Sequence, residues 1–256
     1  MLDVHPPHET THTWKDFFIH IATIVVGLLI AIGLEQTVEA IHNHHARHQL
    51  LEDIHEELVT NQENNRLTQH NLTSLRAYLV ALNRVLMDRR AGKPNFVDPA
   101  MEKGRQYAGY GSSMAAWQSA KESGRASLLP GKQIRLYDRF NIQLEYRHEA
   151  TTRLDQAAGE MQAFEERFRD ARSFMLFGFP SSTPDLSAMS PADLTQYSTL
   201  VATTIQNLDR LAARTAVLDG ENTALLNGAT NEEDLIKIAF KDVNVRIPLQ
   251  DDPATK

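Results

Sequence analysis

The chain has 256 residues, with 33 acidic and 26 basic side chains and a formal net charge of −7. This acidic balance argues against a nucleic-acid-binding protein, which needs a basic face. The hydrophobic content of 42% and the charged content of 23% are ordinary for a folded chain, and strand-like alternation is rare, so we predict an all-α fold.

An uncharged apolar run, Phe17–Leu34, predicts a transmembrane anchor at residues 17–34 that follows a short N-terminal tail at residues 1–16. As a helix, its 18 residues span about 27 Å, close to the ~30 Å hydrocarbon core of a bilayer. Trp14 and Lys15 precede the run, as is typical of a membrane interface. A membrane anchor is therefore the best-supported prediction from the sequence.

A cleaved signal peptide is the alternative interpretation, with a cleavage site at Val38–Ala40. The long apolar run and the single lysine of the tail favour an anchor. Lys15 and Arg47 balance across the run and do not decide its orientation. Because a short tail inside and a long exported part is the commoner arrangement, we expect the bulk of the chain outside the cytoplasm. The absence of cysteine is compatible with either side.

Beyond the anchor, apolar residues recur at steps of three and four, the heptad spacing of a coiled-coil stripe. We predict one helix that continues from the anchor to a stop at Ala91–Pro94, with a break around residues 35–50 as an alternative. The predicted stripe is Leu51, Ile54, Leu58, Asn61, Asn65, Thr68, Leu72, Leu75, Leu79, Leu82 and Leu86.

A polar layer, Asn61, Asn65 and Thr68, interrupts this stripe. Buried asparagine at such positions can specify helix register and partner choice, so we favour a structural role. A ligand cavity or a solvated stretch are the alternatives.

A loop at residues 91–111, a short helix around 113–124 and a turn at 128–131 come next. A third helix is predicted from about residue 132 to 174. Its expected inward residues are Ile134, Tyr137, Leu144, Thr151, Leu154, Ala158, Met161, Phe164 and Phe168.

After a loop at 177–188, Ser190, Pro191 and Asp193 predict a capped start for a fourth helix that ends at Gly228. Its stripe is Leu194, Tyr197, Val201, Thr204, Leu208, Leu211, Thr215, Leu218, Asn222 and Leu225. A last short helix reaches about residue 241, and residues 248–256 are expected to be disordered. Since single-striped helices must pack together, residues 35–247 are predicted to form a membrane-attached antiparallel helical bundle.

Within the anchor, four residues lie on one helical face: His20, Thr23, Gly27 and Ala31. Small residues at this spacing allow two membrane helices to approach closely, so the face predicts a homo-oligomer or another membrane protein as partner. The alternative is a histidine that reaches the lipid headgroups.

Histidines cluster just after the anchor, where His44 and His48 are candidate metal ligands one helical turn apart. The alternative is that the cluster, with His42 and His45, sits at the headgroup layer. Two Glu-x-x-His pairs, Glu52/His55 and Glu145/His148, match the element used by di-iron bundles. Because such pairs arise by chance at about this frequency, we predict no metal or other cofactor.

Two segments resemble a group of bacterial single-pass membrane proteins that share a helical domain of unknown function. One runs from Trp14 through the anchor into the histidine cluster, and the other is Ala116–Gly124, continued by Leu128–Pro130 and the Tyr137 helix. The resemblance implies an inner-membrane protein, and it supplies no catalytic residue. From the residues alone, Trp117 is most simply a core residue, with a ligand-facing position as the alternative.

Motifs for dinucleotide binding, metalloprotease or serine-hydrolase activity are absent from the sequence. We therefore predict a non-enzymatic, membrane-anchored protein that mediates protein interaction or envelope assembly. The alternative is a ligand-sensing module that acts through a membrane partner.

Overall fold

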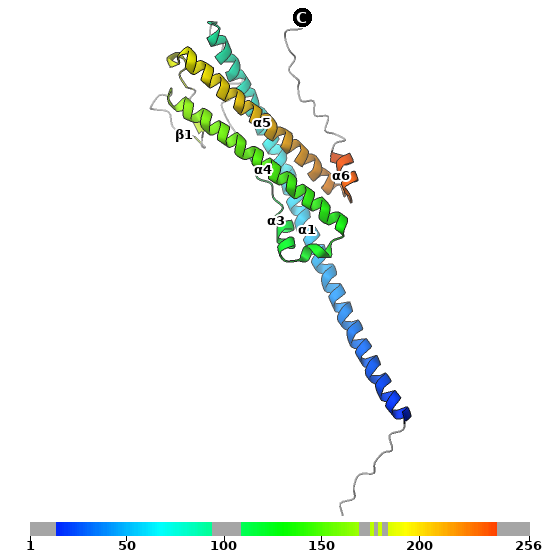
Figure 1. Cartoon of the computed structure of the whole chain (residues 1–256). Coiled ribbons are helices and arrows are strands. Elements are labelled where there is room, and N and C mark those ends of the chain that lie inside the picture. Colours follow the sequence, from blue (N-terminus) through cyan, green and yellow to red (C-terminus); the bar gives the residue numbers. More distant parts are fainter. Residues whose placement is uncertain (1–13, 94–108, 169–174, 177–178, 181–183, 240–256) are drawn as a thin grey trace, which may run out of the picture. The chain divides into compact units, whose positions relative to one another are not determined.

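The computed structural model describes residues 14–93, 109–168, 175–176, 179–180 and 184–239. This part of the chain is mostly helical, and it includes an antiparallel pair of two-residue strands, β1 (Met175–Leu176) and β2 (Phe179–Pro180), and non-helical connections such as residues 109–114 (Figure 1). The predicted all-α class is confirmed. The predicted tails, up to residue 13 and from residue 248, and loop residues 94–108 lie outside the described residues.

The longest element is α1 (Trp14–Arg90), a helix of 77 residues. It confirms the predicted helix that ends at the Ala91–Pro94 stop, with no break around residues 35–50. The chain divides within α1 into two compact units, Met1–Gln49 and Leu50–Lys256. In the first unit, an 18-residue window of α1 has a mean hydropathy of 2.6, and 0% of it is buried. By length and composition, α1 is a candidate membrane span.

In the second unit, the C-terminal half of α1 shares a hydrophobic core with α4 (Gly131–Glu166) and α5 (Pro191–Leu226) (Figure 1). Every predicted α1 stripe position from Ile54 to Leu86 is buried. At the start of the stripe, Leu50 is fully buried and the predicted Leu51 is only half-buried. The stripe of α5 is also buried as predicted, except for its last member, Leu225.

The predicted start of the fourth helix is confirmed in detail at α5. The Asp193 backbone N–H donates to Ser190 Oγ over 3.2 Å, and the Ser190 N–H donates back to Asp193 Oδ2 over 3.1 Å. Pro191 occupies the first turn, where its missing N–H costs nothing. These local contacts form a capping box at the start of α5, and Arg167 adds an ion pair with Asp193 over 3.5 Å.

Helix α4 differs from its prediction in length and in its buried face. It ends at Glu166, and a turn follows, so the predicted extension to residue 174 is wrong as far as residue 168 is described. Leu154, Met161 and Phe164 are buried as predicted, but the other expected inward residues are only half-buried: Ile134, Tyr137, Leu144, Thr151, Ala158 and Phe168.

The reason is that α4 packs in more than one direction. Its buried Leu136 lies in a cluster with α6 (Glu232–Ala239), whereas Phe140 packs with Trp117 of α3 (Ala115–Glu122). Leu154 faces the core shared by the long helices. A single heptad stripe cannot represent three contact directions.

Two 3₁₀ turns complete the second unit. In sequence, η1 (Arg125–Leu128) follows α3, and η2 (Leu186–Ala188) precedes α5. Gly124, the predicted end of the short helix, has a φ of 78°, a conformation that favours glycine. Gly220 allows α6 to approach α5, because a Cβ there would lie 2.8 Å from the carbonyl oxygen of Ala239.

Candidate functional site

The polar layer of α1 binds the backbone of the segment that precedes α3, residues 109–114. Asn61 pairs with both peptide groups of Ser113: its Nδ2 donates to the Ser113 carbonyl over 2.7 Å, and the Ser113 N–H donates to Asn61 Oδ1 over 3.0 Å. Two helical turns further along α1, Thr68 Oγ1 accepts a hydrogen bond from the Tyr110 N–H over 3.1 Å. The polar layer thus binds backbone groups of the 109–114 segment, and Asn61 also lines an open pocket. The favoured structural role and the alternative of a ligand cavity both stay predictions.

Arg147 of α4 holds the same segment and is only 7% exposed. Its Nη1 donates to Ser112 Oγ over 2.7 Å, and its Nη2 donates to the carbonyl oxygen of Tyr110. Ser112 Oγ in turn donates to Asn65 Oδ1 over 3.0 Å. Buried arginine is uncommon unless it is bonded in this way, so the arrangement gives the segment one specific position.

Sequence analysis missed Arg147. A signal was present in the sequence, because Arg147 lies at seven-residue spacing from Phe140, Leu154 and Met161. In the structure all four side chains are buried. An arginine in register with core residues indicates a buried polar network.

Glu57 supplies the N-terminal cap that α3 lacks in its own sequence. Position Met114 makes no side-chain cap. Instead, the Glu57 carboxylate accepts the backbone N–H of Ala115 over 3.0 Å and that of Ala116 over 3.1 Å. It also accepts the Ser113 hydroxyl over 3.3 Å. A carboxylate at a helix N-terminus is favoured by both hydrogen bonding and the helix dipole.

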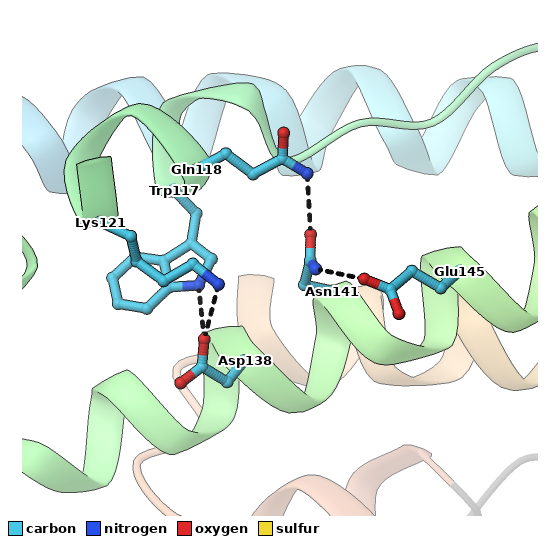
Figure 2. Close-up of polar contacts among 6 residues, drawn as sticks. All are labelled: Trp117, Gln118, Lys121, Asp138, Asn141 and Glu145. Atoms are coloured by element: carbon cyan, nitrogen blue, oxygen red, sulfur yellow. Dashed lines mark hydrogen bonds and ion pairs between the residues drawn. The ribbon is translucent and has the colours of Figure 1, made fainter.

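Helix α3 is also fastened to α4 by Trp117 in its first turn, and this side chain is fully buried as predicted. The Trp117 indole Nε1 donates to Asp138 Oδ1 over 3.1 Å, and Lys121 Nζ donates to the same oxygen over 3.2 Å (Figure 2). The Trp117 ring also packs against Tyr137, with ring centroids 5.3 Å apart. The alternative of a ligand-facing Trp117 is therefore wrong.

Beside this contact, a chain of hydrogen bonds between two side-chain amides and a carboxylate links α3 with α4 (Figure 2). Gln118 Nε2 donates to Asn141 Oδ1 over 3.2 Å, and Asn141 Nδ2 donates to Glu145 Oε1 over 3.2 Å. The three residues line an open pocket of about 590 Å³, to which His148 and Arg153 also contribute. We refer to it as the amide pocket. Its carboxamides, carboxylates and guanidinium can orient a polar ligand.

A second open pocket, of about 600 Å³, shares Ser112 and Ser113 with the amide pocket. Its wall on α1 is acidic and polar, and includes Asp53, Glu56 and Asn64. Asn64 Nδ2 donates to the carbonyl oxygen of Gly111 over 2.7 Å. The 109–114 segment thus contributes to both pockets, and its position shapes both.

Helix α5 carries one buried acid, Glu221, and one half-buried acid, Asp219. Glu221 is 0% exposed and accepts Arg139 Nε over 3.0 Å. Burial raises the pKa of Glu221, and the hydrogen bond with Arg139 offsets only part of this effect. Burial also raises the pKa of Asp219, with a smaller opposing contribution from Asn65.

The candidate metal ligands His44 and His48 are exposed on α1. Among the described residues, no group of three or more His, Asp or Glu side chains is placed to hold a metal ion. The pairs Glu52/His55 and Glu145/His148 do not meet in such a group either.

Comparison with models of protein families finds no match, and comparisons with curated proteins and with solved structures find none either.

The predicted helix-packing face of the anchor, His20, Thr23, Gly27 and Ala31, is exposed along its length. The Thr23 hydroxyl donates to the carbonyl oxygen of Ile19 over 2.9 Å, so it is satisfied within its own helix. A Cβ on Gly27 would meet nothing within 4 Å. No side chain of the described residues covers this face.

Proposed function

We propose that this protein is held in a membrane by residues 17–34 and that residues 35–247 form a membrane-attached antiparallel helical bundle. The observation that carries the proposal is the uncovered apolar surface of α1, with a mean hydropathy of 2.6 over an 18-residue window and 0% burial. Exposed apolar area costs about 25 cal/mol per Å² in water, so lipid is the environment that suits this surface.

In this proposal the protein is non-enzymatic and mediates protein interaction or envelope assembly. The open face around Gly27 supports self-association or docking to another membrane protein, because small residues let helix backbones approach closely. In the second unit, the hydrogen bonds of Arg147 and Glu57 fasten an extended segment to the long helices. Such bonded networks make rigid interaction surfaces.

Membrane insertion is tested by carbonate extraction of the full chain. Replacing Ile24 and Leu28 together by lysine costs about 2.5–3.5 kcal/mol per site in the bilayer centre, so this variant is expected to leave the membrane fraction. The control is Ile41→Lys, an exposed apolar position on α1 beyond the run. Release of the wild-type chain by carbonate, or a mature chain that begins after residue 40, refutes the proposal.

Localisation in the inner membrane with the bulk of the chain in the periplasm is part of the proposal. The chain has no cysteine, so a single introduced thiol reports sidedness without background. Ala202 is exposed on α5, and an Ala202→Cys variant is expected to react with a membrane-impermeant maleimide in intact spheroplasts. Labelling only after lysis contradicts the periplasmic assignment.

A second candidate function is ligand sensing through a membrane partner, and the amide pocket favours it. An open volume of about 590 Å³ is within the range of small-molecule sites, and the Gln118–Asn141–Glu145 chain offers both donors and acceptors. The test is a thermal-shift screen with polar small molecules. A sensed ligand should stabilise the wild type but not Asn141→Leu, while the control Glu160→Gln keeps the response.

A further inference from the structure

A small pocket between α4 and α5 has an unusual charge composition. Its volume is about 180 Å³, and we call it the arginine pocket. Its lining is Tyr146, Glu149, Ala150, Arg153, Arg210 and Arg214. Three guanidinium groups thus face one carboxylate, in a chain whose net charge is −7.

The charges of the arginine pocket are only partly compensated. Arg153 Nη2 donates to Glu149 Oε1, and the two side chains are 53% and 58% exposed. Arg210 makes a long bond, 3.5 Å, to the amide oxygen of Asn207. Within the described part of the chain, no carboxylate pairs with Arg210.

Arg214 is in a similar situation. Its guanidinium carbon lies 5.2 Å from the ring centroid of Tyr146, and no described carboxylate pairs with it. Arg210 and Arg214 are four residues apart on α5, so they are neighbours on one helical face and repel each other. An anion between them would remove this repulsion.

We propose that the arginine pocket binds a phosphate group. Guanidinium groups bind phosphate oxygens through pairs of charge-assisted hydrogen bonds, and arginines from two helices can approach a tetrahedral anion from different sides. The pocket volume suits a phosphate group and bound water, and is below the range of about 300–1,000 Å³ for larger ligands. The phosphate is either inorganic phosphate or the phosphate of a lipid headgroup.

Glu149 is expected to weaken phosphate binding. Its carboxylate occupies Arg153 and repels an incoming anion, so Glu149 competes with phosphate. Glu149 and Arg153 also line the amide pocket. Phosphate that replaces Glu149 as the partner of Arg153 therefore changes the wall of the amide pocket. This proposal does not depend on membrane anchoring, because every residue of the arginine pocket lies in the Leu50–Lys256 unit.

The experiment is calorimetric titration of the full chain, in a detergent without phosphate, with inorganic phosphate against chloride at equal ionic strength. Saturable binding is expected. Arg210→Gln and Arg214→Gln should each weaken it about tenfold, and Glu149→Gln should tighten it by about threefold. The matched control is Arg135→Gln, which removes an exposed arginine of α4 outside the pocket.

A second titration with short-chain phosphatidic acid, and with phosphatidylcholine as its control, separates the two sources of phosphate. Binding of inorganic phosphate alone assigns the pocket to the free anion. Tighter binding of phosphatidic acid, with the same dependence on Arg214, assigns it to a lipid headgroup. The proposal is overturned if neither ligand saturates the protein, or if Arg135→Gln weakens binding as much as Arg214→Gln.

Discussion

Removal of the Glu57 carboxylate tests how the 109–114 segment and α3 are held. Glu57→Ala leaves the N–H groups of Ala115 and Ala116 without their acceptor. Loss of a helix cap costs about 0.5–2 kcal/mol, and hydrogen bonds to a charged group contribute about 1.5–3 kcal/mol each. Because Glu57 is half-buried and solvent replaces part of this interaction, we expect a loss of about 2 kcal/mol.

For a domain of this size, a loss of about 2 kcal/mol lowers the Tm by about 4–8 °C. The assay is thermal unfolding of the full chain in detergent, followed by far-UV circular dichroism, together with amide hydrogen exchange at Ala115 and Ala116. The matched control is Glu56→Ala, an exposed carboxylate on the same helical turn. If Glu57→Ala lowers the Tm no more than Glu56→Ala, and both amides exchange at wild-type rates, Glu57 does not cap α3.

Three further outcomes are expected. Trp117→Ala should lower the free energy of unfolding by about 3–5 kcal/mol, because a fully buried ring is lost. Trp117→Phe should lower it by only about 1 kcal/mol. Urea unfolding that shows equal losses for the two variants contradicts the buried position of Trp117. Burial raises the pKa of Glu221 above its ordinary value of 4.5. Between 4.5 and the raised pKa, the folded protein keeps a proton that the unfolded chain has released. The contribution of Glu221 to the free energy of unfolding therefore falls as the pH rises through this range. Glu221→Gln should flatten this pH dependence in a series of urea unfolding curves, and an unchanged slope would show that another group is responsible. Gly27→Ile combined with Ala31→Ile should reduce self-association in a membrane two-hybrid assay. Gly33→Ile should not, because Gly33 lies outside the predicted face although a Cβ there also meets nothing within 4 Å. Equal effects would argue against a specific face.

Much of the helical architecture follows from signals that are local in the chain. The capping box of α5 depends on Ser190 and Asp193, three residues apart, so it needs no distant partner. The buried stripe of α1 from Ile54 to Leu86 follows from helical periodicity alone. The apolar run at residues 17–34 likewise predicts a membrane span from length and composition.

The candidate site depends on contacts between residues far apart in sequence. Asn61 meets Ser113 across 52 positions, and Arg147 meets Ser112 across 35. Periodicity could place Asn61 on the buried stripe, but it could not identify the extended backbone that Asn61 binds. It also misplaced the inward face of α4, because that helix packs against several neighbours at once. Helical periodicity reports which side of a helix is buried, whereas the partner of a buried polar group is settled only when the chain folds back on itself.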